Sequence, residues 1–176
     1  MFAAFEAHVI NVTAHIENAL NVDTEEIAFG TVFPEEYYDR TFTVSLSSSF
    51  LASERVDDVR YTIAQKPKPR PAYVDQVGAY EARLYCIANP TDYDKCYPNL
   101  CKFLTKTTAE GEGDTETVAR LSKIQQDVAD LWSIHFDVPC VQGHEDQGGD
   151  CTGVVNAEDD YGCDIWVEVT GISETP

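Results

Sequence analysis

Apolar and polar residues alternate along several short segments of the chain, and this pattern constrains the fold more than any other feature of the sequence. It is clear at residues 10–17, 41–46, 59–63, 132–138 and 165–169, and it recurs at 27–33 and 80–87. An extended chain points successive side chains to opposite faces, so each segment is typical of a strand with one buried face. Several short strands separated by turn signals predict a mainly β fold, either a jelly roll or a β-sandwich.

One stretch shows helical rather than strand spacing. Asp114 is a candidate N-cap, and the apolar positions after it recur every three or four residues: Val118, Leu121, Ile124, Val128 and Leu131. This spacing predicts an amphipathic helix within an insertion at about residues 89–131. Since 176 residues suit a single core, we expect one domain over residues 10–176 with one helix-bearing, cysteine-rich insertion.

All six cysteines lie in the C-terminal half: Cys86, Cys96, Cys101, Cys140, Cys151 and Cys163. A zinc site would need short Cys-x-x-Cys pairs, which the sequence lacks, so we assign no metal ligands. An even count at irregular spacing favours two or three disulfides formed in an oxidising compartment, and buried free thiols in a cytosolic protein are the alternative. The sequence does not choose among the possible pairings. If the protein is exported, we expect the chain to be the mature product, with its signal removed.

The charge is strongly negative, because 31 Asp and Glu residues face 12 Lys and Arg residues and give a net charge of −19. Nucleic acids and anionic membrane surfaces are therefore poor partners. No apolar run approaches the length that a bilayer requires, so we expect no membrane insertion. Residues 66–71 concentrate basic residues between prolines, which favours an extended conformation, either as a solvated loop or in contact with an acidic neighbour.

Two acidic clusters flank the last expected strand: His144, Glu145, Asp146 and Asp150 form one, and Glu158, Asp159, Asp160 and Asp164 form the other. Oxygen-rich loops bind Ca²⁺, but neither cluster has the EF-hand spacing. We therefore favour a solvated acidic surface over a calcium site, and we assign no other cofactor.

Catalysis finds no specific support in the sequence. The zinc-protease, serine-hydrolase, phosphate-loop and dinucleotide motifs are all absent. His15 and His135 stand at polar positions of expected strands, where an imidazole usually faces solvent. We expect a protein that is not an enzyme.

The segment that most needs a partner is residues 1–9, which is apolar apart from Glu6 and His8. It alternates in the phase of Phe5, Ala7 and Val9, whereas the next segment alternates in the phase of Ile10. Such a phase change marks a bulge, a bend or a change of packing partner. Either the segment continues the chain's own sheet, or it crosses into another molecule and completes the sheet there.

Several of these features together resemble the TasA/camelysin-like family of secreted bacterial proteins. They are the apolar start, the alternating strand at residues 9–20, the strand–turn–strand unit around Pro34-Glu35-Glu36, and the closing run Ile165-Trp166-Val167-Glu168-Val169. Turns of that family usually read Pro-Gly-Glu or Pro-Gly-Asp, and Glu35 stands at the glycine position. The resemblance implies a jelly-roll domain at the cell surface that assembles biofilm matrix fibres by N-terminal donor-strand complementation.

Applied to this chain, the resemblance makes residues 1–9 the donor strand and the subunit interface, formed by Met1, Phe2, Ala3, Phe5, Ala7 and Val9. The leading hypothesis is a structural subunit of an extracellular homopolymer held together head to tail. The alternative is a monomeric secreted adhesin or glycan-binding β-sandwich that depends on Ca²⁺, with Tyr93, Tyr97 and Trp166 as exposed candidates. A secreted hydrolase is a third and weaker hypothesis.

Overall fold

Two antiparallel sheets lie face to face in the computed structural model, which describes residues 17–108, 111–113, 116–141, 154–155 and 160–174. The larger sheet has the order β1-β2-β7-β4-β5, formed by Leu20–Val22, Tyr37–Leu46, Ala129–Asp137, Leu104–Thr108 and Gly111–Gly113. The smaller has the order β10-β3-β6, formed by Cys163–Glu174, Val56–Pro67 and Glu116–Ser122. Cys140–Val141 (β8) and Val154–Val155 (β9) form a short parallel pair. The mainly β fold is confirmed, and the jelly-roll connectivity stays a prediction.

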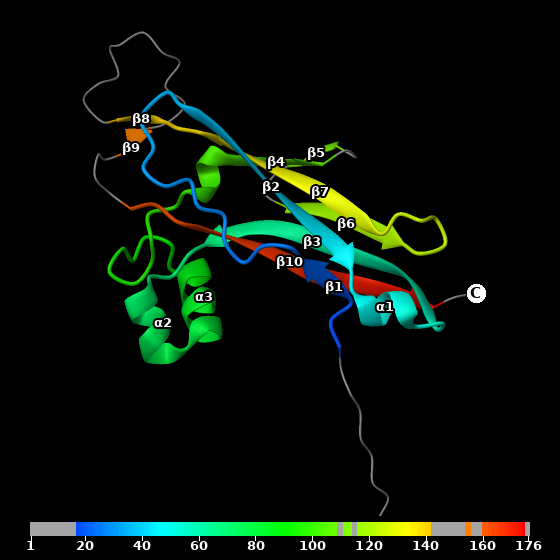
Figure 1. Cartoon of the computed structure of the whole chain (residues 1–176). Helices are drawn as coiled ribbons and strands as arrows, with labels where there is room; N and C mark the ends of the chain where they lie inside the picture. The colour runs from blue at the N-terminus through cyan, green and yellow to red at the C-terminus, as the bar shows by residue number, and fades with distance from the viewer. Residues whose placement is uncertain (1–16, 109–110, 114–115, 142–153, 156–159, 175–176) are drawn as a thin grey trace, which may run out of the picture.

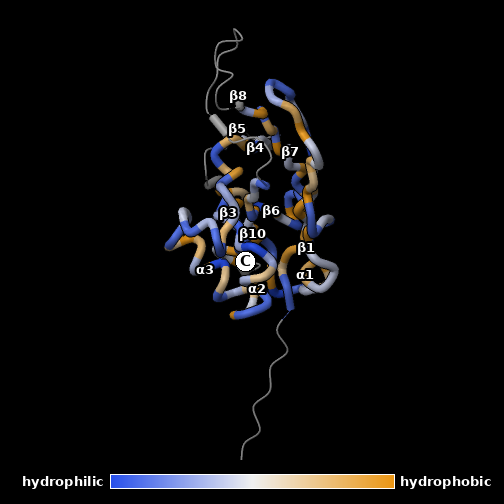
Figure 2. The backbone as a smooth tube through the Cα atoms, turned by 90° about the vertical axis from the view of Figure 1, so that its left-hand side faces the viewer, coloured by the Kyte–Doolittle hydropathy of each residue, from blue (hydrophilic) through white to orange (hydrophobic). Residues whose placement is uncertain are grey.

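The core lies between the two sheets, and the strands alternate between hydrophobic and hydrophilic residues along their length (Figure 2). Its buried side chains come from β2, β7, β3 and β6 and include Phe42, Val44, Trp132, Ile134, Val59, Tyr61, Ile63 and Leu121. The Trp132 indole N–H donates to the Tyr61 hydroxyl at 3.0 Å, and that hydroxyl donates to Asp130. This chain of polar contacts joins the two sheets without leaving the indole N–H unpaired inside the core.

Four of the expected strands are confirmed. Residues 41–46 lie in β2, 59–63 in β3, 132–137 in β7 and 165–169 in β10. The alternate apolar residues of these strands point into the core because the pleat sends every second side chain to the same face, except at Val169, which is 45% exposed. The expected strand at residues 10–17 falls almost wholly outside the described residues.

The expected strand at 27–33 is wrong. Residues 23–36 form no strand, and Ile27, Phe29 and Val32 pack against the core whereas Phe33 is 63% exposed, so the alternation holds only as far as Phe29. The segment follows β1 at the edge of its sheet, and its backbone-to-backbone contact with β2 is an isolated hydrogen bond from the Asp23 N–H to the Thr43 carbonyl at 3.2 Å rather than a ladder.

The expected helix over residues 114–131 is also wrong. Glu116–Ser122 pairs with β3 as β6, and Ala129–Asp137 forms β7. Within β6 the buried apolar residues are Ala119 and Leu121, two positions apart, whereas Val118 is 68% exposed. The apolar residues of this stretch show helical spacing because some of them face the core and others face solvent.

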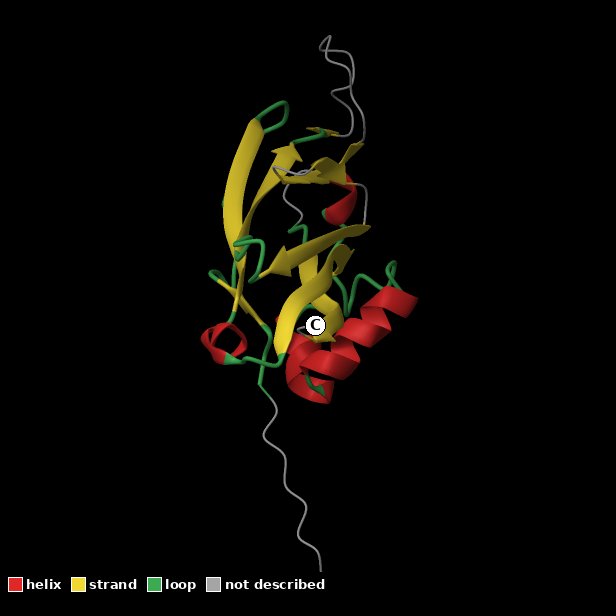
Figure 3. Ribbon diagram, turned by 90° about the vertical axis from the view of Figure 1, so that its right-hand side faces the viewer, coloured by secondary structure: helices red, strands yellow, loops and turns green. Residues whose placement is uncertain are grey.

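Helices form instead at Ser48–Ala52 (α1), Pro71–Val77 (α2) and Ala79–Ala88 (α3), with a short 3-10 turn at Cys101–Phe103 (η1). The expected strand at 80–87 is therefore wrong, because Ala82 and Cys86, four residues apart, form the buried face of α3. Figure 3 shows α2 and α3 together beside the smaller sheet. The basic run at 66–71 leaves β3 and enters α2 at Pro71, which occupies the first turn.

The expected turn at Pro34-Glu35-Glu36 is confirmed. Glu35 has a φ of 66°, in the left-handed region that favours glycine. The Glu36 carboxylate accepts a hydrogen bond from the Phe33 N–H at 2.8 Å and another from the Tyr38 hydroxyl. These bonds, above all that of Tyr38, lower the pKa of Glu36 and compensate for a turn that has no glycine.

Disulfide bonds form as expected. Cys86 pairs with Cys96, and Cys101 pairs with Cys163, which ties η1 to the start of β10. Cys140 is disulfide-bonded as well, and Cys151 lies outside the described residues. The cysteines are therefore structural cross-links between the loops and the sheets.

Candidate functional site

Among the described residues, the outer edge of β10 has no backbone partner along most of its length. β10 is the edge strand of its sheet and pairs only with β3 among the described strands. Just before it, Gly162 is bonded to the segment that precedes η1: its N–H donates to the Pro98 carbonyl, and its carbonyl accepts from the Leu100 N–H, each at 3.0 Å. From Cys163 onward, the described residues offer that edge no further backbone hydrogen bond. An exposed strand edge of this kind is a template for adding another strand.

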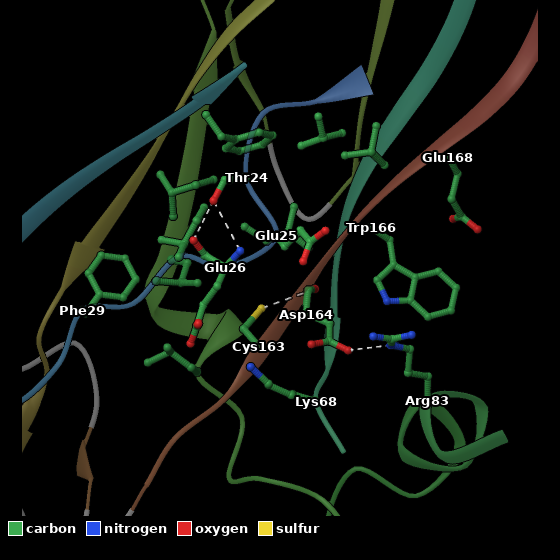
Figure 4. A pocket seen from close by; sticks show the side chains of 18 of the residues that line it. Thr24, Glu25, Glu26, Phe29, Lys68, Arg83, Cys163, Asp164, Trp166 and Glu168 are labelled. Carbon is green, nitrogen blue, oxygen red and sulfur yellow. Dashed lines mark hydrogen bonds and ion pairs between the residues drawn. The ribbon is translucent and has the colours of Figure 1, made fainter. Parts of the chain in front are cut away.

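A groove of about 480 Å³ runs beside this free edge (Figure 4). Residues between Val22 and Phe29 form its opposite wall. The apolar lining comes from both sheets, from the segment after β1 and from the residue before η1, and includes Val22, Ile27, Phe29, Phe42, Leu100, Leu104, Ile134, Ile165 and Val167. The sandwich is thus open between β10 and the segment after β1, and apolar side chains line the opening.

Charged and aromatic residues surround the mouth of the groove: Glu25, Glu26, Lys68, Tyr80, Arg83, Asp164, Trp166 and Glu168. Arg83 on α3 donates from Nε to an Asp164 oxygen at 3.1 Å. Lys66 pairs with Glu168 at 3.0 Å, and its ammonium lies 3.8 Å from the centre of the Trp166 ring. The basic run therefore contacts an acidic neighbour in its own chain, as one of the two sequence interpretations expected.

The wall opposite β10 is anchored to the larger sheet at both ends. At Asp23, one carboxylate oxygen accepts from the Thr43 N–H at 2.8 Å, which lowers the pKa of Asp23. At the other end, the Phe29 ring packs edge-on against Phe136 with 5.0 Å between ring centres. Because these anchors hold the wall in place, the groove does not depend on a strand ladder along residues 23–29.

The N-terminal segment enters the described structure at one end of the sandwich. Ser47, which caps α1, holds this segment in place. Its hydroxyl donates to the Asn18 carbonyl at 2.7 Å, and its N–H donates to the Ala19 carbonyl at 2.9 Å. Figure 1 shows residues 17–20 next to α1. The expected donor residues, Met1, Phe2, Ala3, Phe5, Ala7 and Val9, lie outside the described residues.

Of the aromatic residues expected at a glycan site, only Trp166 lines the groove. Tyr97 packs its ring under Arg70, 4.8 Å from the guanidinium carbon, and Tyr93 is 55% exposed in the same loop. Sequence reasoning had no signal for the free edge of β10, because an edge strand and a central strand show the same alternation.

His135 lies on the outer face of the larger sheet, where the sequence placed it, within a hydrogen-bonded cluster. Its Nδ1 contacts Asp39 and lies 2.7 Å from the Tyr37 hydroxyl, and its Nε2 lies 2.8 Å from the Thr107 hydroxyl. The bond from His135 lowers the pKa of Asp39, whereas desolvation is the main cause that raises the pKa of Tyr37. The cluster cross-links β2, β7 and β4 and lies on the face opposite the core.

Within the part of the chain that is described, no group of three His, Cys, Asp or Glu residues is arranged to hold a metal ion. The acidic cluster expected at 144–150 lies outside that part, as do Glu158 and Asp159 of the second cluster, whereas Asp160 and Asp164 of that cluster are described. None of the helices among the described residues is long and apolar enough to cross a bilayer. No known protein family, curated protein or solved structure matches the chain.

Proposed function

We propose that the chain is a structural subunit of an extracellular filament, in which residues 1–9 of one copy add a strand to β10 of the next. The observation that carries this proposal is the apolar groove beside the free edge of β10. A strand placed there gains backbone hydrogen bonds from β10 and fills the groove with alternate side chains.

The chemistry of residues 1–9 suits such a groove. Every odd position is apolar, and these are Met1, Ala3, Phe5, Ala7 and Val9, whereas the even positions include Glu6 and His8. In a strand, the odd set shares one face. That face enters the groove between Phe29 and Val167, where burial of each large side chain contributes roughly 1.5–3 kcal/mol.

Another copy, rather than the same chain, supplies this strand. Asn18 and Ala19 are held next to α1, and the chain then runs from Val22 along the groove as its wall. To fill its own groove, the N-terminal segment would have to reverse direction beside β1. A donor that leaves one end of each subunit for the side of the next makes a heterologous contact, which generates a filament when it does not close.

The remaining properties agree with a role outside the cell. The disulfides Cys86–Cys96 and Cys101–Cys163 form in an oxidising compartment, which supports secretion. The net charge of −19 keeps free subunits apart before assembly. In this proposal, the subunit is not an enzyme, and the filament is a homopolymer of identical chains.

The proposal is tested by electron microscopy and sedimentation of the purified chain and of a variant that lacks residues 1–9. We expect filaments from the full chain and only monomers from the truncated one. In the full chain, Phe5→Asn should abolish filaments because it places an unpaired amide in the groove, whereas the matched His8→Asn, in the opposite phase, should still assemble.

Filaments that persist without residues 1–9 would refute the donor strand. A full chain that stays monomeric and instead binds glycans, with loss of binding in a chelator, would favour the adhesin alternative.

A further inference from the structure

Arg83 reaches the mouth of the groove with only part of its guanidinium engaged. Its Nε donates to Asp164, and its side chain is 45% exposed. Neither Nη group has a hydrogen-bond or ion-pair partner among the described residues. Since a guanidinium offers five donors in a fixed fork, Arg83 can hold a second carboxylate while it keeps Asp164.

The pleat of an added strand determines which side chains meet Arg83. When Phe5 points into the groove, Glu6 points to the opposite face. On β10 that face carries Asp164, Trp166 and Glu168, because Ile165 and Val167 point to the core. Arg83 lies on the same face, above Asp164 and next to Trp166 (Figure 4).

In a donated strand, the carboxylate of Glu6 would need a cation near Asp164 and Glu168. It is the only Asp, Glu, Lys or Arg in residues 1–9, and without a partner it would lie beside the carboxylates of Asp164 and Glu168. Like charges on neighbouring strands are destabilising.

Two other cations line or border the groove but suit Glu6 less well. The ammonium of Lys66 is already engaged by Glu168 and by the Trp166 ring. Lys68 lines the groove as well, but its ammonium lacks the planar fork by which Arg83 can hold Asp164 and a second carboxylate at the same time.

We propose that Arg83 of one subunit binds Glu6 of the strand donated by the next, and that this ion pair fixes the register in which the donor enters the groove. The inference rests on the proposed function. A donor shifted by one residue would lose the ion pair and would also present Glu6 to the apolar lining.

The experiment uses charge reversal in the full chain. Glu6→Arg alone and Arg83→Glu alone each create a like-charge contact, and we expect the critical concentration for assembly to rise about tenfold in each. Mixing the two variants should restore assembly, because each donor then meets an acceptor of opposite charge and the filament alternates between them. The double variant Glu6→Arg/Arg83→Glu should assemble by itself.

Arg55→Glu is the matched control, since Arg55 is an exposed arginine outside the lining of the groove. It should assemble alone almost as the wild type does, and its mixture with Glu6→Arg should show no rescue. Melting temperatures of all variants report whether each one folds, and Arg83→Gln, which adds no negative charge, should raise the critical concentration about threefold if Arg83→Glu does not fold.

Normal assembly of Arg83→Glu and Arg83→Gln, or a mixture no better than its components, would overturn the assignment of Arg83 while wild-type filaments still form. A wild type whose assembly does not depend on residues 1–9 would overturn the donor strand itself and the ion pair with it.

Discussion

Single residues shape the end of the groove where β10 begins. Gly162 is buried, and a Cβ on it would lie 2.9 Å from the Cβ and Cγ of Tyr97. This close approach lets Gly162 bond to the backbone of the segment before η1. Glycine is needed here for space rather than for a special backbone conformation, because the clash is with a side chain.

Replacing Gly162 tests this close approach. Gly162→Ala should destabilise the protein by about 1–3 kcal/mol, because the new methyl group overlaps the Tyr97 side chain and displaces the segment that starts the groove. Gly171→Ala, within β10, is the control, since no atom lies within 4 Å of the added Cβ, and its effect should be within about 0.5 kcal/mol. Denaturant unfolding measures both values, and equal destabilisation by the two variants would contradict the packing argument.

At the scale of the elements, the two halves of β10 have different surroundings. Its first half lines the groove with Ile165 and Val167, whereas its second half, beyond the irregularity at Gly171, carries the exposed residue Ile172. The strand pairs with β3 throughout. Both halves therefore pair with β3, but only the first half borders the groove.

This difference predicts a position-dependent effect on assembly. Val167→Asp places a carboxylate in the apolar groove and should raise the critical concentration for filament formation by at least about tenfold. Ile172→Asp makes the same chemical change on the same strand outside the groove and should leave assembly nearly unchanged. Sedimentation of folded variants, checked by circular dichroism, measures the effect, and an equal loss for both would argue against the groove as the acceptor.

For the whole molecule, the charge bears on how filaments of the proposed kind would interact. The chain has a net charge of −19 and an isoelectric point near 4.3. Subunits of such a charge repel each other at neutral pH, so in the proposed assembly the contacts between filaments would be weak while the donor strand would hold each filament together. Carboxylates that are protonated near the isoelectric point no longer supply this repulsion.

We therefore expect filaments to stay separate at pH 7, to bundle near pH 4.3, and to separate again when the pH is raised. Light scattering and electron microscopy measure the change in diameter. In buffer of high ionic strength at pH 7, screening of the same repulsion should produce bundling as well. Filaments of unchanged diameter under both conditions would show that charge does not control their lateral contacts.

The sequence by itself determined the fold class, because alternation within β2, β3, β7 and β10 reports directly which side chains a pleated strand can bury. It also predicted disulfides, since an even number of cysteines without metal-site spacing favours cross-links, but it did not choose their pairing. It predicted a strand at 80–87, where α3 forms, and a helix at 114–131, where β6 and the start of β7 form, because spacing alone does not say that Val118 faces solvent or that Ala82 is buried.

Only the tertiary structure decided where a functional surface lies. Alternation in Ile165 and Val167 is the same whether a strand is paired on one edge or on two, so the free edge of β10 follows from the order β10-β3-β6 and not from local residues. The position of Arg83 beside Asp164 depends on how α3 packs over residues 81 positions away in the chain. Local patterns specify what each segment buries, whereas long-range packing specifies what is left without a partner.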